Sequence, residues 1–201
     1  MSARNTAPAI ALAAFEALAN HKNPKLLVQT ADHYIQDLDA FSDVVMEAIA
    51  SDAPFVLFGV QPTRPETGYG YIECGKPEGT TFLVASFKEK PDLDTAKHYV
   101  DAGKYLWNSG MFMLDAHSYL EALKRFEPEI FECCRQAFDK ASTDLDFKRV
   151  DNEAFSASPS ISIDYAVMER IEDLHVIPYQ GDWSDVGAWD SVAALTPKDA
   201  S

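Results

Sequence analysis

Two aspartates stand where a strand is expected to end and a helix to begin. Asp32 follows the apolar run 26–30, and Asp185 lies just before Gly187. In open α/β sheets, ligands bind at the carboxyl ends of the strands, where the loops diverge. A carboxylate at that edge can hold Mg²⁺, which prefers oxygen ligands together with nucleotide phosphates. Each aspartate could equally cap the helix that follows it, and the local sequence leaves both interpretations open.

Two more segments combine residue types that suit a sugar phosphate. The segment 87–91 carries Glu89 and Lys90. A lysine is a compact charge that suits a phosphate, and a neighbouring glutamate can accept hydrogen bonds from sugar hydroxyls. The segment 105–112 places the amide of Asn108 and a hydroxyl between bulky apolar residues, as carbohydrate pockets require. Taken alone, the first could be a solvated strand end and the second a loop entering a strand.

Two other signals carry less weight. The pattern Asp-Leu-Asp occurs at 37–39, 92–94 and 144–146 and could suggest the metal motif of a glycosyltransferase. The first two copies stand where helices should begin, and the chain has 32 acidic residues, so the pattern arises easily. His33 and His117 have no partners at metal-ligand spacing, which favours ordinary polar histidines.

The elements that must position these residues alternate between helical and strand patterns. An early β–α–β order predicts a mostly parallel α/β sheet. The middle of the chain predicts an antiparallel pair that turns near Glu78-Gly79. Helices are expected over 7–20, from 39 or 42, and over 93–102, 116–126, 129–141 and 163–171, with one more after 187. Strands are expected over 26–30, 55–60, 68–72, 82–87 and 175–178, and a loop or marginal hairpin over 144–159. Residues 1–201 form one domain in this interpretation.

Composition narrows the range of partners. The chain has 201 residues and a net charge of −15, which disfavours nucleic acids and anionic membranes as partners. One lysine and backbone N–H groups can still bind a small phosphorylated ligand. No apolar run reaches the roughly 18 residues that a membrane span needs. The odd cysteine count, with Cys133 and Cys134 adjacent, predicts free thiols in a reducing cytoplasm.

Seven strings along the chain together resemble the bacterial mannose-1-phosphate guanylyltransferases, which are sugar-1-phosphate nucleotidyltransferases. They occur in family order at 4–10, 31–33, 66–72, 87–91, 107–112, 162–169 and 183–187. The resemblance implies a Rossmann-like nucleotidyltransferase fold, with a mixed, mostly parallel sheet flanked by helices. It also implies a reaction in which mannose 1-phosphate and GTP give GDP-mannose and pyrophosphate.

The resemblance further implies roles for individual residues. Two aspartates would hold Mg²⁺ against the phosphates, namely Asp32 and Asp185. The residues that would hold the sugar phosphate are Lys90 for the phosphate and Glu89, Asn108 and the backbone at Gly70 for the mannose hydroxyls. The start of the first helix would line the nucleotide side, through Asn5, Thr6 and Pro8. The segment 163–169 would pack against the domain, with Asp164 as a further candidate for the site.

The chain departs from the family pattern in one respect. The family domain begins with a strand and a Gly-rich loop that cradles the triphosphate, and no such segment stands before Arg4. We therefore expect an N-terminally truncated domain that is inactive alone and poorly stable or associated, because sheet edges are left uncovered. A non-catalytic paralogue that binds a sugar phosphate or nucleotide sugar is the alternative. A homo-oligomer is left open.

Overall fold

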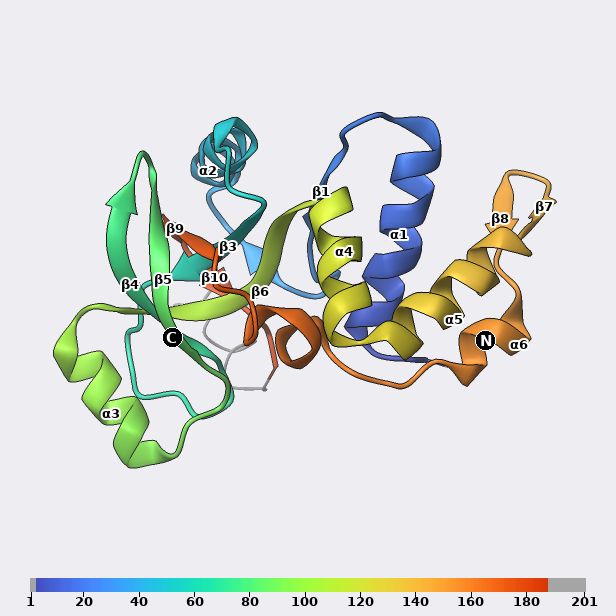
Figure 1. The fold of residues 1–201 in the computed structure, drawn as a ribbon. Coiled ribbons are helices and arrows are strands. Elements are labelled where there is room, and N and C mark those ends of the chain that lie inside the picture. The colour runs from blue at the N-terminus through green and yellow to red at the C-terminus, as the bar shows by residue number, and fades with distance from the viewer. Residues whose placement is uncertain (1–2, 188–201) are drawn as a thin grey trace, which may run out of the picture.

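A mixed six-stranded sheet forms the centre of the computed structural model, which describes residues 3–187 (Figure 1). Its strand order is β1-β6-β3-β9-β5-β4, and β6 also pairs with β4. The strands are β1 (Lys25–Val28), β3 (Phe55–Val60), β4 (Tyr71–Glu78), β5 (Thr81–Lys88), β6 (Tyr105–Asp115) and β9 (His175–Tyr179). Strand β3 is buried along its whole length, as its run of apolar residues predicts.

The sheet is mixed, as expected, but the expectation that it is mostly parallel is wrong. Strand β6 runs antiparallel to β1, β3 and β4, whereas β9 runs parallel to β3 and antiparallel to β5. Strands β1, β3, β4 and β9 therefore point the same way. Because β6 lies between β1 and β3, the β3–β9 ladder is the one parallel pair among the described strands. A β–α–β order alone does not reveal such an insertion.

Helices cover both faces of this sheet. Helices α1 (Thr6–Asn20), α4 (Ala116–Phe126) and α5 (Pro128–Asp139) are grouped together, away from α2 (Leu38–Ala50) and α3 (Leu93–Ala102) (Figure 1). Each group buries its own apolar cluster. In α4, for example, Tyr119, Leu120 and Leu123 share one buried stripe at helical spacing.

Aspartate caps define where several helices begin. The side chain of Asp37 accepts a hydrogen bond from Ala40 N at 2.9 Å, and that of Asp92 accepts one from Thr95 N at 2.8 Å. Such caps satisfy N–H groups that lack a partner within the helix. The first two Asp-Leu-Asp patterns are therefore helix starts, as expected. At the other end of α3, Gly103 adopts a left-handed φ of 67° and terminates the helix.

The structure corrects several expected elements. The hairpin of β7 (Ser142–Asp144) and β8 (Phe147–Arg149) overlaps the segment 144–159, where a loop or marginal hairpin was expected. The same segment also contains the short helix α6 (Asn152–Ala157), which the sequence did not predict. The expected helix 163–171 is instead a π-helix, η1 (Asp164–Met168). The short strands β2 (Tyr34–Ile35) and β10 (Trp183–Ser184) form a separate two-stranded sheet and were also missed. The helix expected after Gly187 lies outside the described residues.

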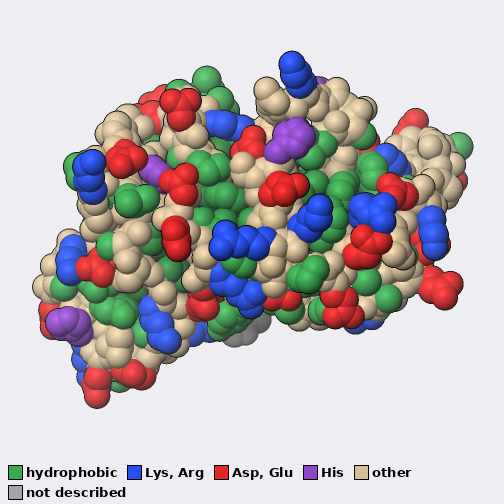
Figure 2. All heavy atoms as spheres, viewed as in Figure 1, with side chains coloured by type: hydrophobic (Ala, Val, Ile, Leu, Met, Phe, Trp, Pro, Cys, Tyr) green, Lys and Arg blue, Asp and Glu red, His purple; other side chains and the backbone are tan. Residues whose placement is uncertain are grey.

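The surface mixes both signs of charge. Figure 2 shows basic side chains near the middle of one face, with acidic side chains interspersed among them. Strand β1 lies at one edge of the described sheet, where Leu27 is 39% exposed. Within residues 3–187, no helix combines the length and apolar character needed to cross a membrane. All three cysteines are free, as expected.

Candidate functional site

A hollow of about 200 Å³ lies beside the carboxyl ends of β1, β5 and β10. Larger hollows of about 510 and 420 Å³ lie beside His175 and Arg170, but they gather no comparable set of predicted site residues. We assign the candidate site on this chemistry rather than on size. The smaller hollow is lined by Thr30, His33, Gly68, Tyr69, Gly70, Glu89, Lys90, Asn108, Ser109, Gly110, Asp164, Trp183 and Asp185.

Gly70 and Asn108 bring the start of β4 against the middle of β6. The backbone N–H of Asn108 donates to Gly70 O at 2.8 Å. A Cβ atom at Gly70 would lie 2.5 Å from Glu89 Oε2 and 3.1 Å from Asn108 Cβ. Residue 70 must therefore be glycine if the two side chains are to reach the hollow, since no Cβ fits there.

Glu89 and Lys90 follow β5 directly. Lys90 has a φ of 47°, and its N–H donates to Tyr69 O at 3.2 Å. Its ammonium lies 3.5 Å from Glu89 Oε1, whereas Glu89 Oε2 is buried with no partner. Burial raises the pKa of Glu89, and the charge of Asp164 adds to this effect, against the opposing effect of Lys90. A buried carboxylate oxygen without a donor is costly, which is typical of a site arranged for a ligand.

Asn108 and Asp164 form a second polar pair. Asn108 Nδ2 donates to Asp164 Oδ1 at 2.8 Å, and Asn108 Oδ1 accepts from Gly110 N at 3.1 Å. Burial raises the pKa of Asp164, and the Asn108 hydrogen bond partly offsets the rise. Asp164 begins the π-helix η1, and such helices occur often at functional sites. The N–H of Ile163 donates to Thr6 Oγ1 at 2.9 Å, so the start of α1 helps to position η1.

The two-stranded sheet brings Asp32 and Asp185 into one region. Strand β10 pairs with β2 in the register Ser184↔Tyr34, so Asp185 and Asp32 extend from neighbouring segments. His33 Nδ1 accepts from Trp183 Nε1 at 3.2 Å and reinforces this pairing. Burial lowers the pKa of His33, while the charges of Asp32 and Asp185 oppose that shift. Both carboxylates therefore lie near the same imidazole.

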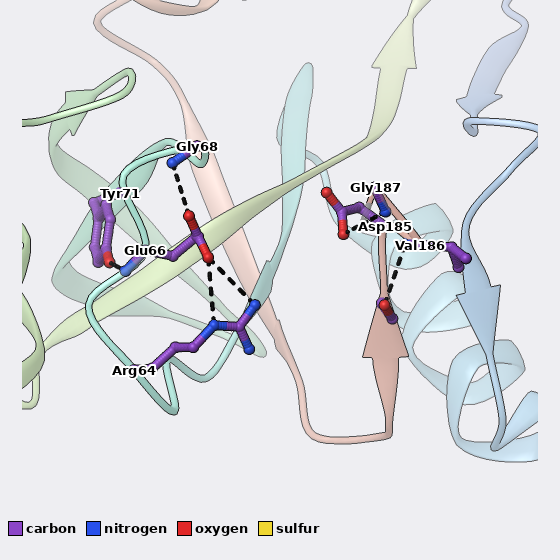
Figure 3. Close-up of polar contacts among 8 residues, drawn as sticks. Arg64, Glu66, Gly68, Tyr71, Asp185, Val186 and Gly187 are labelled. Atoms are coloured by element: carbon purple, nitrogen blue, oxygen red, sulfur yellow. Dashed lines mark hydrogen bonds and ion pairs between the residues drawn. The ribbon is translucent and has the colours of Figure 1, made fainter. Parts of the chain in front are cut away.

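Asp185 itself is held by its neighbours. Its Oδ1 accepts from Gly187 N at 3.2 Å, and Val186 N donates to Ser184 Oγ at 3.1 Å (Figure 3). Burial raises the pKa of Tyr69, and a hydrogen bond to Asp185 raises it further. The Tyr69 phenol consequently stays protonated and can donate to this carboxylate. Val186 has a φ of 51°, a strained conformation for a β-branched residue.

Glu66 orders the loop that leads into the hollow. Its carboxylate contacts Arg64 at 3.3 Å and accepts from Gly68 N at 3.1 Å, while its own N–H donates to Tyr71 Oη at 2.9 Å (Figure 3). Arg64 also lies 5.5 Å from the centre of the Trp107 ring. These contacts order the loop just before Gly68, Tyr69 and Gly70, which line the hollow.

Most of the predicted site residues meet at this hollow. Five of them line it, namely Gly70, Glu89, Lys90, Asn108 and Asp185. Asp32 lies just outside the lining, next to His33. Asn5 caps α1, where its side chain accepts from Thr6 N at 2.8 Å, and Thr6 contacts the segment before Asp164. Pro8 is buried in α1, and its carbonyl contacts Cys134 Sγ, so it does not line the hollow. The predicted roles of these residues remain predictions.

Sequence reasoning missed several lining residues. Tyr69 lies between Trp107 and Trp183, with ring centres 5.2 and 5.5 Å away. His33 was interpreted as an ordinary polar histidine, yet it contacts Trp183 and the hollow. Its position directly after Asp32 is the one local signal that could have indicated this. Backbone strain is a further signal that only the structure shows. The non-glycine residues with positive φ include the predicted site residues Asn5 and Lys90, and Val186, which follows Asp185.

The mixed sheet, with a polar hollow at its strand ends, has the arrangement of an α/β domain that binds a ligand at this edge of the sheet. Comparison with known sequences agrees, since the nucleotidyl transferase family model matches residues 1–201. The chain belongs to this nucleotidyl transferase family. The nucleotidyltransferase fold expected from the sequence is therefore confirmed, although its sheet is mixed rather than mostly parallel.

Individual relatives are more specific. The chain is 53% identical over 201 residues to the mannose-1-phosphate guanylyltransferase RfbM of Salmonella typhimurium, covering 98% of this chain and 42% of that protein. It is 50% identical over 198 residues to the xanthan biosynthesis protein XanB of Xanthomonas campestris, with the same coverage. A crystal structure from Thermus thermophilus, described as a mannose-1-phosphate geranyltransferase, superposes with a TM-score of 0.86 at 34% identity. That match covers 98% of this chain and 57% of the other. The chain thus spans about two fifths of the length of these curated relatives.

Proposed function

We propose that this chain forms the sugar-phosphate side of a mannose-1-phosphate guanylyltransferase, acting in the cytoplasm in GDP-mannose and polysaccharide biosynthesis. The observation that carries the proposal is the hollow where Lys90, Glu89 and Asn108 converge with Asp185. It offers one cation for a phosphate and several acceptors for hydroxyls, which is the pattern of a sugar 1-phosphate. The identity of the curated relatives supports mannose and GTP as the substrates.

The reaction needs little acid–base chemistry from the protein. A phosphate oxygen of mannose 1-phosphate bonds to the α-phosphorus of GTP, and the bond from that phosphorus to the bridging oxygen breaks as pyrophosphate leaves. The attacking phosphate is already ionised, so the chain contributes mainly positioning and charge neutralisation. Lys90 binds the attacking phosphate, and Glu89 and Asn108 orient the sugar ring behind it.

Family membership implies a divalent cation, and we propose Mg²⁺ held by Asp32 and Asp185. The donor set fits, because two carboxylates on neighbouring strand ends leave the remaining positions to phosphate and water oxygens, as Mg²⁺ prefers. Among residues 3–187, no group of three or more His, Cys, Asp and Glu side chains is arranged to hold a metal, so the proposed site rests on this pair. When bound, the ion would neutralise charge on the nucleotide phosphates.

Calorimetry with mannose 1-phosphate and with free mannose tests this proposal. Lys90→Ala should weaken mannose 1-phosphate binding by roughly tenfold to a hundredfold, the range for a charge-assisted contact. Free mannose should bind both proteins equally, since it has no phosphate. Lys148→Ala is the matched control, because Lys148 pairs with Glu16 far from the hollow. A wild-type chain that is folded but does not bind mannose 1-phosphate would contradict the proposal.

A turnover assay separates the enzyme from its alternative. Pyrophosphate release from GTP and mannose 1-phosphate is measured for the chain alone and for the product of the complete reading frame that encodes it. Turnover by the complete product supports the transferase. Affinity for GDP-mannose with no pyrophosphate release by either protein would favour the non-catalytic paralogue instead.

A further inference from the structure

Two carboxylates line the hollow, those of Glu89 and Asp164, and described side chains leave both only partly paired. Glu89 Oε2 is buried and has no hydrogen-bond partner. Asp164 uses Oδ1 to accept from Asn108 Nδ2, and no other side chain among residues 3–187 donates to this carboxylate. Both groups are adjacent to Asn108, because Gly70 brings Glu89 Oε2 and Asn108 Cβ against the same point. The site therefore offers two neighbouring carboxylates that can accept hydrogen bonds from a ligand, and Glu89 Oε2 has no donor within the described residues.

Asn108 is already largely committed to the protein. Its Oδ1 accepts from Gly110 N, which fixes the amide so that Nδ2 points at Asp164. One N–H of the Asn108 amide, which was expected to bind a sugar hydroxyl, therefore donates to Asp164 instead. The amide in turn holds the Asp164 carboxylate beside it at the hollow, so both groups can contact a ligand.

We propose that Asp164 is a specificity-determining residue that contacts the sugar directly, with Asp164 and Glu89 accepting hydrogen bonds from two hydroxyls on adjacent ring carbons. This inference rests on the proposed function, since it assigns a second sugar contact within the same hollow. Adjacent hydroxyls on a sugar ring supply two donors side by side, which matches two neighbouring carboxylate oxygens. A site built to bind hydroxyls rejects analogues that lack them, because its buried acceptors are then left unpaired.

The support of Asp164 comes from a part of the chain remote in sequence. Ile163 N donates to Thr6 Oγ1, and Ala7 N donates to Ile161 O, so α1 holds the segment just before η1. The N–H of Glu169 donates to Asp164 O at 3.0 Å and closes the π-turn. Hydrogen bonds therefore hold the backbone on both sides of Asp164, and this positions its carboxylate. A residue that discriminates between ligands requires such support.

Asp164→Asn distinguishes a sugar contact from a purely structural role. An asparagine at 164 keeps an oxygen that can accept from Asn108 Nδ2, but its other corner becomes a donor. Binding of mannose 1-phosphate and of its 2-deoxy, 3-deoxy and 4-deoxy analogues is measured by calorimetry. We expect Asp164→Asn to weaken mannose 1-phosphate binding at least roughly tenfold, as for loss of a hydrogen bond to a charged group. One deoxy analogue should bind the variant as well as mannose 1-phosphate does, although the wild type discriminates against it.

Controls separate the outcomes. Asp146→Asn, in the turn between β7 and β8, should leave all affinities unchanged. The side-chain NH₂ signals of Asn108 in an NMR spectrum should persist in Asp164→Asn, showing that the amide is still held. Wild-type affinity in Asp164→Asn, or an equal loss for every deoxy analogue, would overturn the role of Asp164 while leaving the proposed function intact. No binding of mannose 1-phosphate by the wild type would overturn both.

Discussion

The two carboxylate pairs of the site are built differently. Glu89 directly follows the eight-residue strand β5, Asp164 begins η1, which α1 supports, and burial raises the pKa of both carboxyls. Asp32 is exposed and Asp185 is half-buried, and both lie beside strands of only two residues. The buried pair forms a preorganised set of acceptors for neutral hydroxyl donors. The more exposed pair keeps its charge accessible, as a site for a cation and phosphates requires.

The variant with the largest expected effect adds a side chain beside the buried carboxylates. Gly70→Ala places a Cβ 2.5 Å from Glu89 Oε2 and 3.1 Å from Asn108, so the acceptors must move. Displacement of about 1 Å costs roughly a hundredfold where geometry is fixed, and we expect a loss of that size in mannose 1-phosphate affinity. Calorimetry measures it, with Thr80→Ala, in the exposed turn between β4 and β5, as a control remote from the hollow. Unchanged affinity in Gly70→Ala would show that the buried pair is not preorganised.

A second test removes a contact that positions only the more exposed carboxylates, Asp32 and Asp185. His33→Ala removes the acceptor for Trp183 Nε1, so β10 loses a tie to β2 and Asp185 can drift from Asp32. Loss of such an outer contact typically costs roughly tenfold in metal affinity. We expect that loss for Mn²⁺, followed by electron paramagnetic resonance, and little change for mannose 1-phosphate.

His33→Asn is the control for this experiment, because an asparagine Oδ1 can accept near the position of Nδ1. It should restore most of the Mn²⁺ affinity. Equal Mn²⁺ binding in the wild type and His33→Ala would mean that the His33–Trp183 contact does not position the carboxylates.

The smallest expected effect concerns stability. Because burial raises the pKa of Glu89, the folded chain binds this proton more tightly than the unfolded chain does, and stability falls as pH rises through the folded pKa. Glu89→Gln removes the buried charge and should raise the free energy of unfolding by about 1 kcal/mol at pH 8. The gain should vanish below about pH 4, where the carboxyl is protonated in both states.

Urea titrations at both pH values measure this difference. Glu172→Gln is the matched control, since Glu172 is exposed and pairs with no side chain in the described part of the chain. A gain that is independent of pH would show that ionisation of Glu89 is not its cause.

The sequence determined the elements that depend on local chemistry. Helix α3 begins at its Asp92 cap and ends at Gly103, and β3 follows its unbroken apolar run from Phe55 to Val60. Spacing of apolar residues and capping groups acts within a few positions, so one sequence is enough to reveal it. The polar residues Glu89, Lys90 and Asn108, which line the hollow, were recognisable as site candidates from their local sequence.

Only the tertiary structure decided which of these residues meet. The β6 insertion beside β1, the β2–β10 pairing and the contact between Thr6 and the segment before Asp164 join parts of the chain that are remote in sequence. Asp164 has the same local pattern whether it caps a helix or faces a ligand. Its role depends on the Asn108 amide and the unpaired Glu89 oxygen beside it. Long-range packing sets such neighbours, and residue spacing along the chain does not encode them.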